Sequence, residues 1–93
     1  MARLTTKHED GTYTVDASEV MRTIEGSYTG SAIERLAAFE DAVEVTELQL
    51  ASVVEKLEDL KARGSLRTAT AQQLLAQKLT YSTTLRLMGV VKD

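Results

Sequence analysis

The chain has 93 residues, which is enough for one domain near the lower size limit of a single hydrophobic core. Hydrophobic residues make up 43% of it and the formal net charge is −3, which excludes disorder by composition and argues against nucleic acid as a partner. The chain has no cysteine, so disulfides and thiolate metal sites are excluded.

Residues 3–15 predict a β-hairpin. β-branched and aromatic residues lie on both sides of Asp10-Gly11, a dipeptide that favours the tight turn of a hairpin. A lone two-stranded hairpin is marginal in water, so within this β-hairpin region, residues 3–24, it must either lie on the helices or gain a third strand. Residues 19–24 are the candidate third strand, and the glycine-containing residues 25–30 are expected to form a loop.

A long helix is predicted over residues 31–63. Ser31 and Glu34 have the spacing of an N-terminal capping box, and Gly64 is expected to end the helix. The helix carries an apolar stripe at heptad spacing, which is typical of helix–helix packing and is interrupted only by Thr46. The stripe consists of Leu36, Phe39, Val43, Leu50, Val53, Leu57 and Leu60.

A shorter helix is predicted over residues 68–88, with Thr70 and Gln73 as a second possible capping box and Gly89 at its end. Val90 and Val91 are expected to fold back onto its last turn. The short connection between the two helices predicts an antiparallel helical hairpin. The expected fold is therefore mainly α (α+β): one domain over residues 1–93, with a β-hairpin followed by a helical hairpin.

The two helices differ in length, so the shorter helix can cover only the C-terminal part of the longer one, roughly residues 48–60. The uncovered part of the long helix is still apolar. We expect the hairpin to cover some of it and a second copy of the chain to cover the rest, because symmetric pairing is the commonest solution in soluble oligomers. The predicted homodimer interface consists of Ile33, Leu36, Phe39, Val43 and Leu50.

The middle of the long helix is predicted to carry an acidic face, formed by Glu40, Asp41, Glu44 and Glu47. Two interpretations stay open for it. It is either a solvated helix face or a docking surface for a basic groove on a partner. Paired carboxylates for hydrolysis need a cleft, which one helix face does not offer. We therefore expect no enzyme activity, no catalytic residues and no cofactor.

Two smaller features have an ordinary and a functional interpretation. His8, beside Glu9 and Asp10, suggests either part of a metal site or an exposed turn, and we favour the turn because no further ligand converges in sequence. Tyr81 lies in a Ser/Thr-rich stretch of the second helix and is a candidate contact anchor. No metal site is predicted.

The opening residues lack the apolar core of a signal peptide, and no apolar run is long enough to span a bilayer. We therefore expect a cytoplasmic protein without membrane contact.

Three segments resemble a family of small uncharacterised proteins encoded by phages and prophages of Gram-positive bacteria. They are RLTTKHEDGTYTV at residues 3–15, AIERLAAFED at residues 32–41 and TATAQQLLAQKLTYSTTLRLMGV at residues 68–90. The chain departs from the family pattern at residues 87–90, where LMGV replaces a more aromatic ending. The resemblance implies an accessory protein of the infected cell, and it supplies no catalytic residues.

Three functions follow as hypotheses. The first is a non-enzymatic accessory protein that binds a host or phage protein, in its sharpest form an inhibitor of a host defence nuclease (anti-CRISPR-like). The second is a structural or assembly protein of the virion. The third, a small transcriptional regulator, is disfavoured because neither predicted helix is a basic recognition helix.

Overall fold

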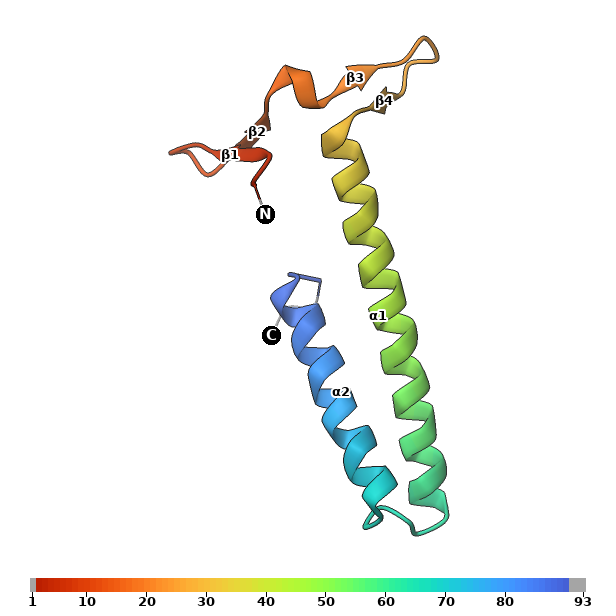
Figure 1. The fold of residues 1–93 in the computed structure, drawn as a ribbon. Helices are drawn as coiled ribbons and strands as arrows, with labels where there is room; N and C mark the ends of the chain where they lie inside the picture. Colours follow the sequence, from red (N-terminus) through yellow and green to blue (C-terminus); the bar gives the residue numbers. More distant parts are fainter. Residues whose placement is uncertain (1, 91–93) are drawn as a thin grey trace. The chain divides into compact units, whose positions relative to one another are not determined.

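The structure, a computed structural model, describes residues 2–90. Two helices follow an N-terminal β region, as predicted: α1 (Ser31–Ala62) is long and α2 (Ala69–Leu87) is shorter, and the two are antiparallel (Figure 1). The mainly helical fold class is confirmed. The preceding elements are β1 (Thr5–Lys7), β2 (Tyr13–Val15), the short 3-10 helix η1 (Ala17–Glu19), β3 (Met21–Arg22) and β4 (Tyr28–Thr29).

The chain divides into two compact units, Met1–Glu40 and Asp41–Asp93, and α1 contributes residues to both. The single domain expected over residues 1–93 stays a prediction. Among the described residues, every buried hydrophobic side chain lies in the second unit. These side chains are Val53, Leu57, Ala71, Leu74 and Leu85.

The predicted first hairpin is confirmed. β1 and β2 pair in antiparallel register with Lys7 opposite Tyr13. The His8 amide donates to the Thr12 carbonyl at 2.8 Å, and the Gly11 amide donates to the His8 carbonyl at 3.0 Å. Gly11, with φ of 88°, is the only residue of this turn at positive φ. The turn is therefore a three-residue loop that ends in glycine rather than a two-residue turn.

The third strand predicted over residues 19–24 is wrong in its pairing and its extent. Only Met21 and Arg22 are extended, and they pair with β4 in a second, separate hairpin. Residues 25–30, expected to be a loop, thus contain the partner strand. The reason is a second glycine turn, in which the Thr23 amide donates to the Ser27 carbonyl at 2.8 Å and Gly26 has φ of 86°.

The two hairpins are similar in sequence as well as in backbone geometry. Residues 7–15 read KHEDGTYTV and residues 22–30 read RTIEGSYTG. Each segment has an acidic residue, a glycine, a hydroxyl residue, a tyrosine and a threonine in the same order. Each also places a basic residue directly opposite its tyrosine, Lys7 opposite Tyr13 and Arg22 opposite Tyr28. The N-terminal unit therefore contains two related hairpins in tandem.

Helix α1 begins at Ser31, so Ser31 is the first helical residue and not the predicted cap. The Gly30 carbonyl accepts the first helical hydrogen bond, from the Glu34 amide at 3.0 Å. The end of α1 agrees with the prediction to one residue. Gly64 has φ of 68°, and the Ser65 amide donates back to the Leu60 carbonyl at 2.8 Å, as in a Schellman cap.

Helix α2 is capped by Thr68 and not by Thr70, because the Thr68 hydroxyl accepts a hydrogen bond from the Ala71 amide at 3.2 Å. At the other end, the Val90 amide donates to the Leu85 carbonyl at 3.1 Å. The predicted fold-back of Val90 is confirmed, whereas Val91 lies outside the described residues.

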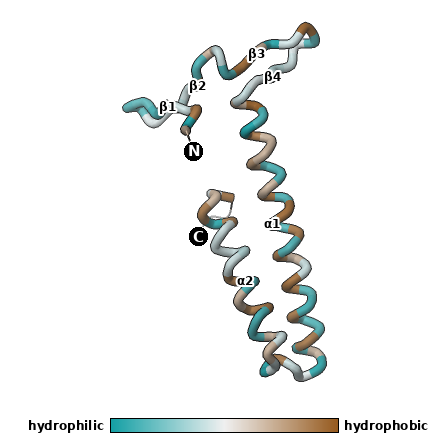
Figure 2. The backbone as a smooth tube through the Cα atoms, viewed as in Figure 1, coloured by the Kyte–Doolittle hydropathy of each residue, from teal (hydrophilic) through white to brown (hydrophobic). Residues whose placement is uncertain are grey.

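The core of the helical hairpin is small and aliphatic. Val53 and Leu57 on α1 pack with Leu74 on α2, and the partly buried Leu60 and Tyr81 lie against them. Hydrophobic and hydrophilic stretches alternate along both helices (Figure 2). This packing covers the C-terminal part of the apolar stripe, as the difference in helix lengths predicts.

Candidate functional site

Burial changes steeply along the apolar stripe of α1. Val53 and Leu57 retain only 5% and 8% of their accessible surface, whereas Leu36 and Phe39 retain 52% and 42%. Val43 and Leu50 lie between these extremes. Large apolar side chains are normally withdrawn from water, so an exposed row of them at regular spacing indicates a contact surface.

The exposed part of the stripe lines a groove of about 680 Å³ in the N-terminal unit. We call it the N-terminal groove. One wall is the first turns of α1, and the other comes from the segment before β1, from β2 and from the residue after η1. The apolar side chains that line it are Leu4, Val15, Val20, Ile33, Leu36 and Phe39.

The charged residues that line the N-terminal groove are both basic. Arg3 and Arg35 contribute to it, and no carboxylate does so among the described residues. Arg3 lies over the Tyr13 ring, 5.6 Å from its centroid, which is within cation–π range. Arg35 donates a hydrogen bond from its guanidinium to the Ala2 carbonyl. The groove is thus apolar between two positive charges, which suits an apolar partner that carries acids.

The structure brings together only part of the predicted dimer interface. Ile33, Leu36 and Phe39 lie in the N-terminal groove and are exposed. Val43 and Leu50 are half-buried in the second unit, the unit that contains the helical hairpin. The sequence identified the α1 wall of this groove from its heptad spacing. The sequence also indicates that the hairpin covers part of this stretch, but it does not single out Leu4, Val15 and Val20, because they have no common spacing.

The predicted acidic face is present on α1 and is exposed. Glu40, Asp41, Glu44 and Glu47 are all exposed, and among residues 2–90 none of them is within ion-pair distance of a basic group. Among residues 2–90, an ion pair joins Asp59, in the last turns of α1, to Arg63, just after the helix, at 3.1 Å. The described residues hold no cluster of three metal-ligating side chains.

His8 does not belong to a cluster of metal-ligating side chains among the described residues either. Its Nε2 lies 2.7 Å from the Thr14 hydroxyl across the first hairpin, on an exposed surface. Asp10 is engaged in the turn itself, where its carboxylate accepts hydrogen bonds from the hydroxyl and amide of Thr12 at 2.6 and 3.0 Å. The interpretation of these residues as an exposed turn therefore agrees with their contacts.

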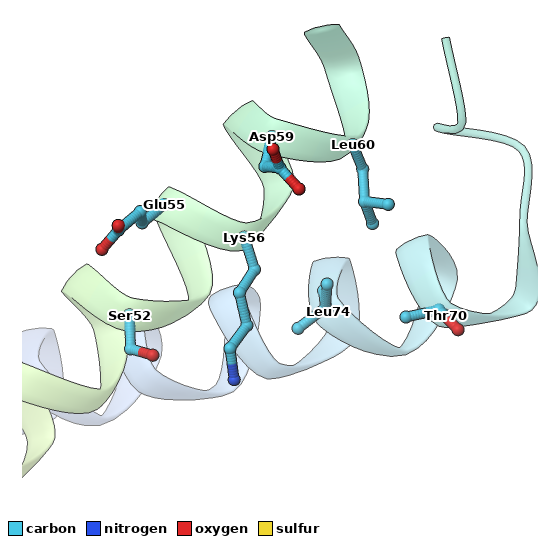
Figure 3. A pocket seen from close by; sticks show the side chains of 7 residues that line it. All are labelled: Ser52, Glu55, Lys56, Asp59, Leu60, Thr70 and Leu74. Atoms are coloured by element: carbon cyan, nitrogen blue, oxygen red, sulfur yellow. The ribbon is translucent and has the colours of Figure 1, made fainter. Parts of the chain in front are cut away.

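A second cleft lies between the two helices of the helical hairpin, with a volume of about 470 Å³ (Figure 3). Leu60 and Leu74 form its apolar part, and the chain of Lys56 extends alongside them. Glu55 and Asp59 lie on the α1 side. Asp59 is paired with Arg63 outside the cleft.

The Ser/Thr-rich stretch of α2 has a structural role. The hydroxyls of Thr80 and Thr84 donate to the carbonyls of Ala76 and Thr80, one turn earlier, at 3.0 and 2.8 Å. These side chains are thus satisfied within the helix. Tyr81, considered as a contact anchor, packs against the hydrophobic core instead.

Comparisons of the chain with protein-family models, with curated proteins and with solved structures find no match. Within residues 2–90, neither helix has the length and apolarity that crossing a membrane requires. The candidate site is therefore defined by its geometry, and the N-terminal groove is the feature with the clearest chemical character.

Proposed function

We propose that this protein is a non-enzymatic phage or prophage accessory protein that acts by binding other proteins. The observation that carries the proposal is the N-terminal groove, where Leu36 and Phe39 stay exposed although they continue the stripe that forms the core further along α1. An apolar surface of this kind gains free energy when a partner removes it from water, at about 25 cal/mol per Å² of apolar area.

The first partner is a second copy of the chain. Helices with an apolar stripe at heptad spacing pair with each other, and two-fold pairing presents the same surface on both subunits. The homodimer is expected to form through Ile33, Leu36 and Phe39, while Val43 and Leu50 contribute at the margin because they are already half-buried.

Light scattering coupled to size exclusion, over a concentration series, tests this proposal. The wild-type protein is expected to reach the mass of two chains, and Leu36→Glu is expected to reduce it to one. Leu48→Glu is the matched control, because Leu48 is 72% exposed on α1 but outside the apolar stripe. A wild-type monomer throughout the series would contradict the dimer.

A second candidate function rests on the acidic face. Its exposed carboxylates, free of ion pairs within the described chain, have the charge to occupy a phosphate-binding groove. The proposed partner is a host defence nuclease, in the manner of an anti-CRISPR protein, and the setting is the cytoplasm of the infected cell.

A plaquing assay tests the second candidate in cells with an active CRISPR defence. Expression of the protein is expected to restore plaquing of a targeted phage, and replacement of the four acids by Gln or Asn is expected to abolish the effect. The matched control replaces Glu55 and Glu58, two other exposed acids of α1. Equal protection by all variants would remove the acidic face from the mechanism.

A further inference from the structure

Where it lines the N-terminal groove, the apolar stripe of α1 is flanked by opposite charges at defined helical positions. With Leu36 at position a and Phe39 at position d of a heptad, Arg35 occupies position g and Glu40 position e. Both side chains are exposed, so one base and one acid border the apolar stripe on its two sides. Residues at e and g decide the orientation and partner of paired helices through their charges.

The charges distinguish the two possible orientations. In a parallel, in-register pair, position g of one helix faces position e of the next heptad on the other helix. Arg35 of each protomer then faces Glu40 of the partner subunit, and the two-fold axis produces this pair twice. In an antiparallel pair, position e faces position e, so the acids at that position, Glu40 and Glu47, face acids of the partner subunit. In the parallel pair Glu40 faces Arg35 instead of another acid, so the facing charges attract each other.

We propose that the N-terminal groove is occupied by the first turns of α1 of a second copy, parallel and in register over residues 32–40, with Arg35 of each protomer paired to Glu40 of the other. The pairing is confined to these turns because Val53 and Leu57, further along the stripe, already pack with Leu74 of their own chain. The inference rests on the self-association proposed above and adds its orientation and its specificity. Leu36 and Phe39 of the two copies meet at the centre, between the two ion pairs.

Arg35 is suited to this contact. Its guanidinium has five N–H donors, and the bond to the Ala2 carbonyl uses one of them. The remaining donors can receive a carboxylate in bidentate geometry, which adds directional specificity to the attraction. Glu40 is exposed and makes no ion pair among residues 2–90. Within one chain the two residues are five positions apart, so they are not neighbours on their own helix.

A charge-swap series tests the ion pair. Arg35→Glu and Glu40→Arg are each expected to weaken the dimer by roughly three- to fivefold, and the double variant is expected to restore its dissociation constant. Glu44→Arg, on the outer side of α1, is the matched control and is expected to leave dimerisation unchanged. A double variant no tighter than either single variant would overturn the pairing of Arg35 with Glu40.

Disulfide trapping tests the orientation. The chain has no cysteine, so a disulfide formed by a single-cysteine variant must join the same position of two copies. In the parallel pair, position d lies beside its own copy, and Phe39→Cys is expected to give a covalent dimer on oxidation. Ala32→Cys, one heptad earlier, repeats the test with Phe39 intact. Leu48→Cys faces away from the stripe and is expected to stay uncrosslinked.

The outcomes separate this inference from the proposed function. A dimer by light scattering in which neither position 32 nor position 39 crosslinks would overturn the parallel orientation and leave self-association intact. A monomer by light scattering would overturn both. A dimer that crosslinks at both positions and recovers its affinity in the double charge swap supports the inference as stated.

Discussion

At the scale of single residues, Gly30 is the position with the strictest requirement. Its φ of 124° is a conformation that other residues rarely adopt. A Cβ placed there would lie 2.5 Å from the Glu19 carbonyl oxygen and 3.1 Å from the Val20 Cα. Both contacts are with backbone, which cannot move aside as a flexible side chain can. Gly30 therefore allows the second hairpin to lie close to the end of η1.

Gly30→Ala is expected to disrupt the N-terminal unit. The unfavourable φ alone costs roughly 1–2 kcal/mol, and the backbone overlap adds to it. Gly11→Ala is the matched control, since φ at Gly11 is also positive but its Cβ would meet nothing within 4 Å. Hydrogen exchange of the Thr23 amide, which is bonded to the Ser27 carbonyl, measures the effect. Equal protection in Gly30→Ala and the wild type would refute it.

Asp10 predicts a pH dependence of the first hairpin. Hydrogen bonds from the hydroxyl and the amide of Thr12 hold the pKa of this carboxyl below its usual 3.8. Because the folded pKa is the lower one, the carboxylate stabilises the hairpin above pH 3.8 and loses this contribution as the pH falls through the folded pKa.

The Thr12 amide resonance is therefore expected to titrate with a midpoint below 3.8, and Asp10→Asn is expected to remove the transition. Asp16 is an internal comparison, since hydrogen bonds from the Ser18 amide and hydroxyl lower its pKa as well. A Thr12 midpoint at or above the ordinary aspartate value would contradict the assigned hydrogen bonds.

At the scale of elements, the helical hairpin depends on a few side chains. Val53, Leu57 and Leu74 form the buried cluster, and no larger group of buried residues supports them within the described chain. The helix ends are fixed locally, by Thr68 at the start of α2 and by Gly64 and Gly89 after the two helices. Local capping sets where the helices stop, and the cluster makes them pack.

Leu57→Ala is expected to destabilise the helical hairpin by about 2–5 kcal/mol, the usual range for removing a buried leucine side chain. Leu48→Ala on the same helix is expected to stay within about 0.5 kcal/mol, because Leu48 is largely exposed. Urea unfolding followed by circular dichroism at 222 nm measures both. Similar midpoints for the two variants would show that Leu57 is not part of the stabilising core.

At the scale of the whole molecule, the buried side chains are unevenly distributed. All of those found among the described residues lie in the unit Asp41–Asp93, while the first unit consists of two short hairpins and the start of α1. Two-stranded hairpins of this length are not stable by themselves in water. The two units should thus differ in their ability to fold in isolation.

A fragment of residues 41–93 is expected to keep its helical signal and to melt cooperatively. A fragment of residues 1–40 is expected to lose the dispersed amide resonances of its hairpins. Circular dichroism and two-dimensional NMR of the two fragments measure this difference. Leu57→Ala in the fragment of residues 41–93 serves as a control, because it is expected to abolish cooperative melting. A structured fragment of residues 1–40 would contradict the argument.

The sequence by itself determined the features that depend on neighbouring residues. The helix ends followed from Gly64 and Gly89, the first hairpin from Asp10-Gly11, and the stripe of α1 from its heptad spacing. The second hairpin could also have been predicted, because EGSYT repeats the DGTYT pattern fifteen residues later.

Only the tertiary structure decided which part of the stripe stays exposed and what faces it. Leu36 and Leu57 have the same residue type and equivalent spacing, yet one is 52% exposed and the other 8%. The difference depends on contacts between segments far apart in the chain, such as Leu57 with Leu74, or the groove walls formed by Val15 and Phe39. Periodicity specifies a face of a helix, but what covers that face is set by long-range packing.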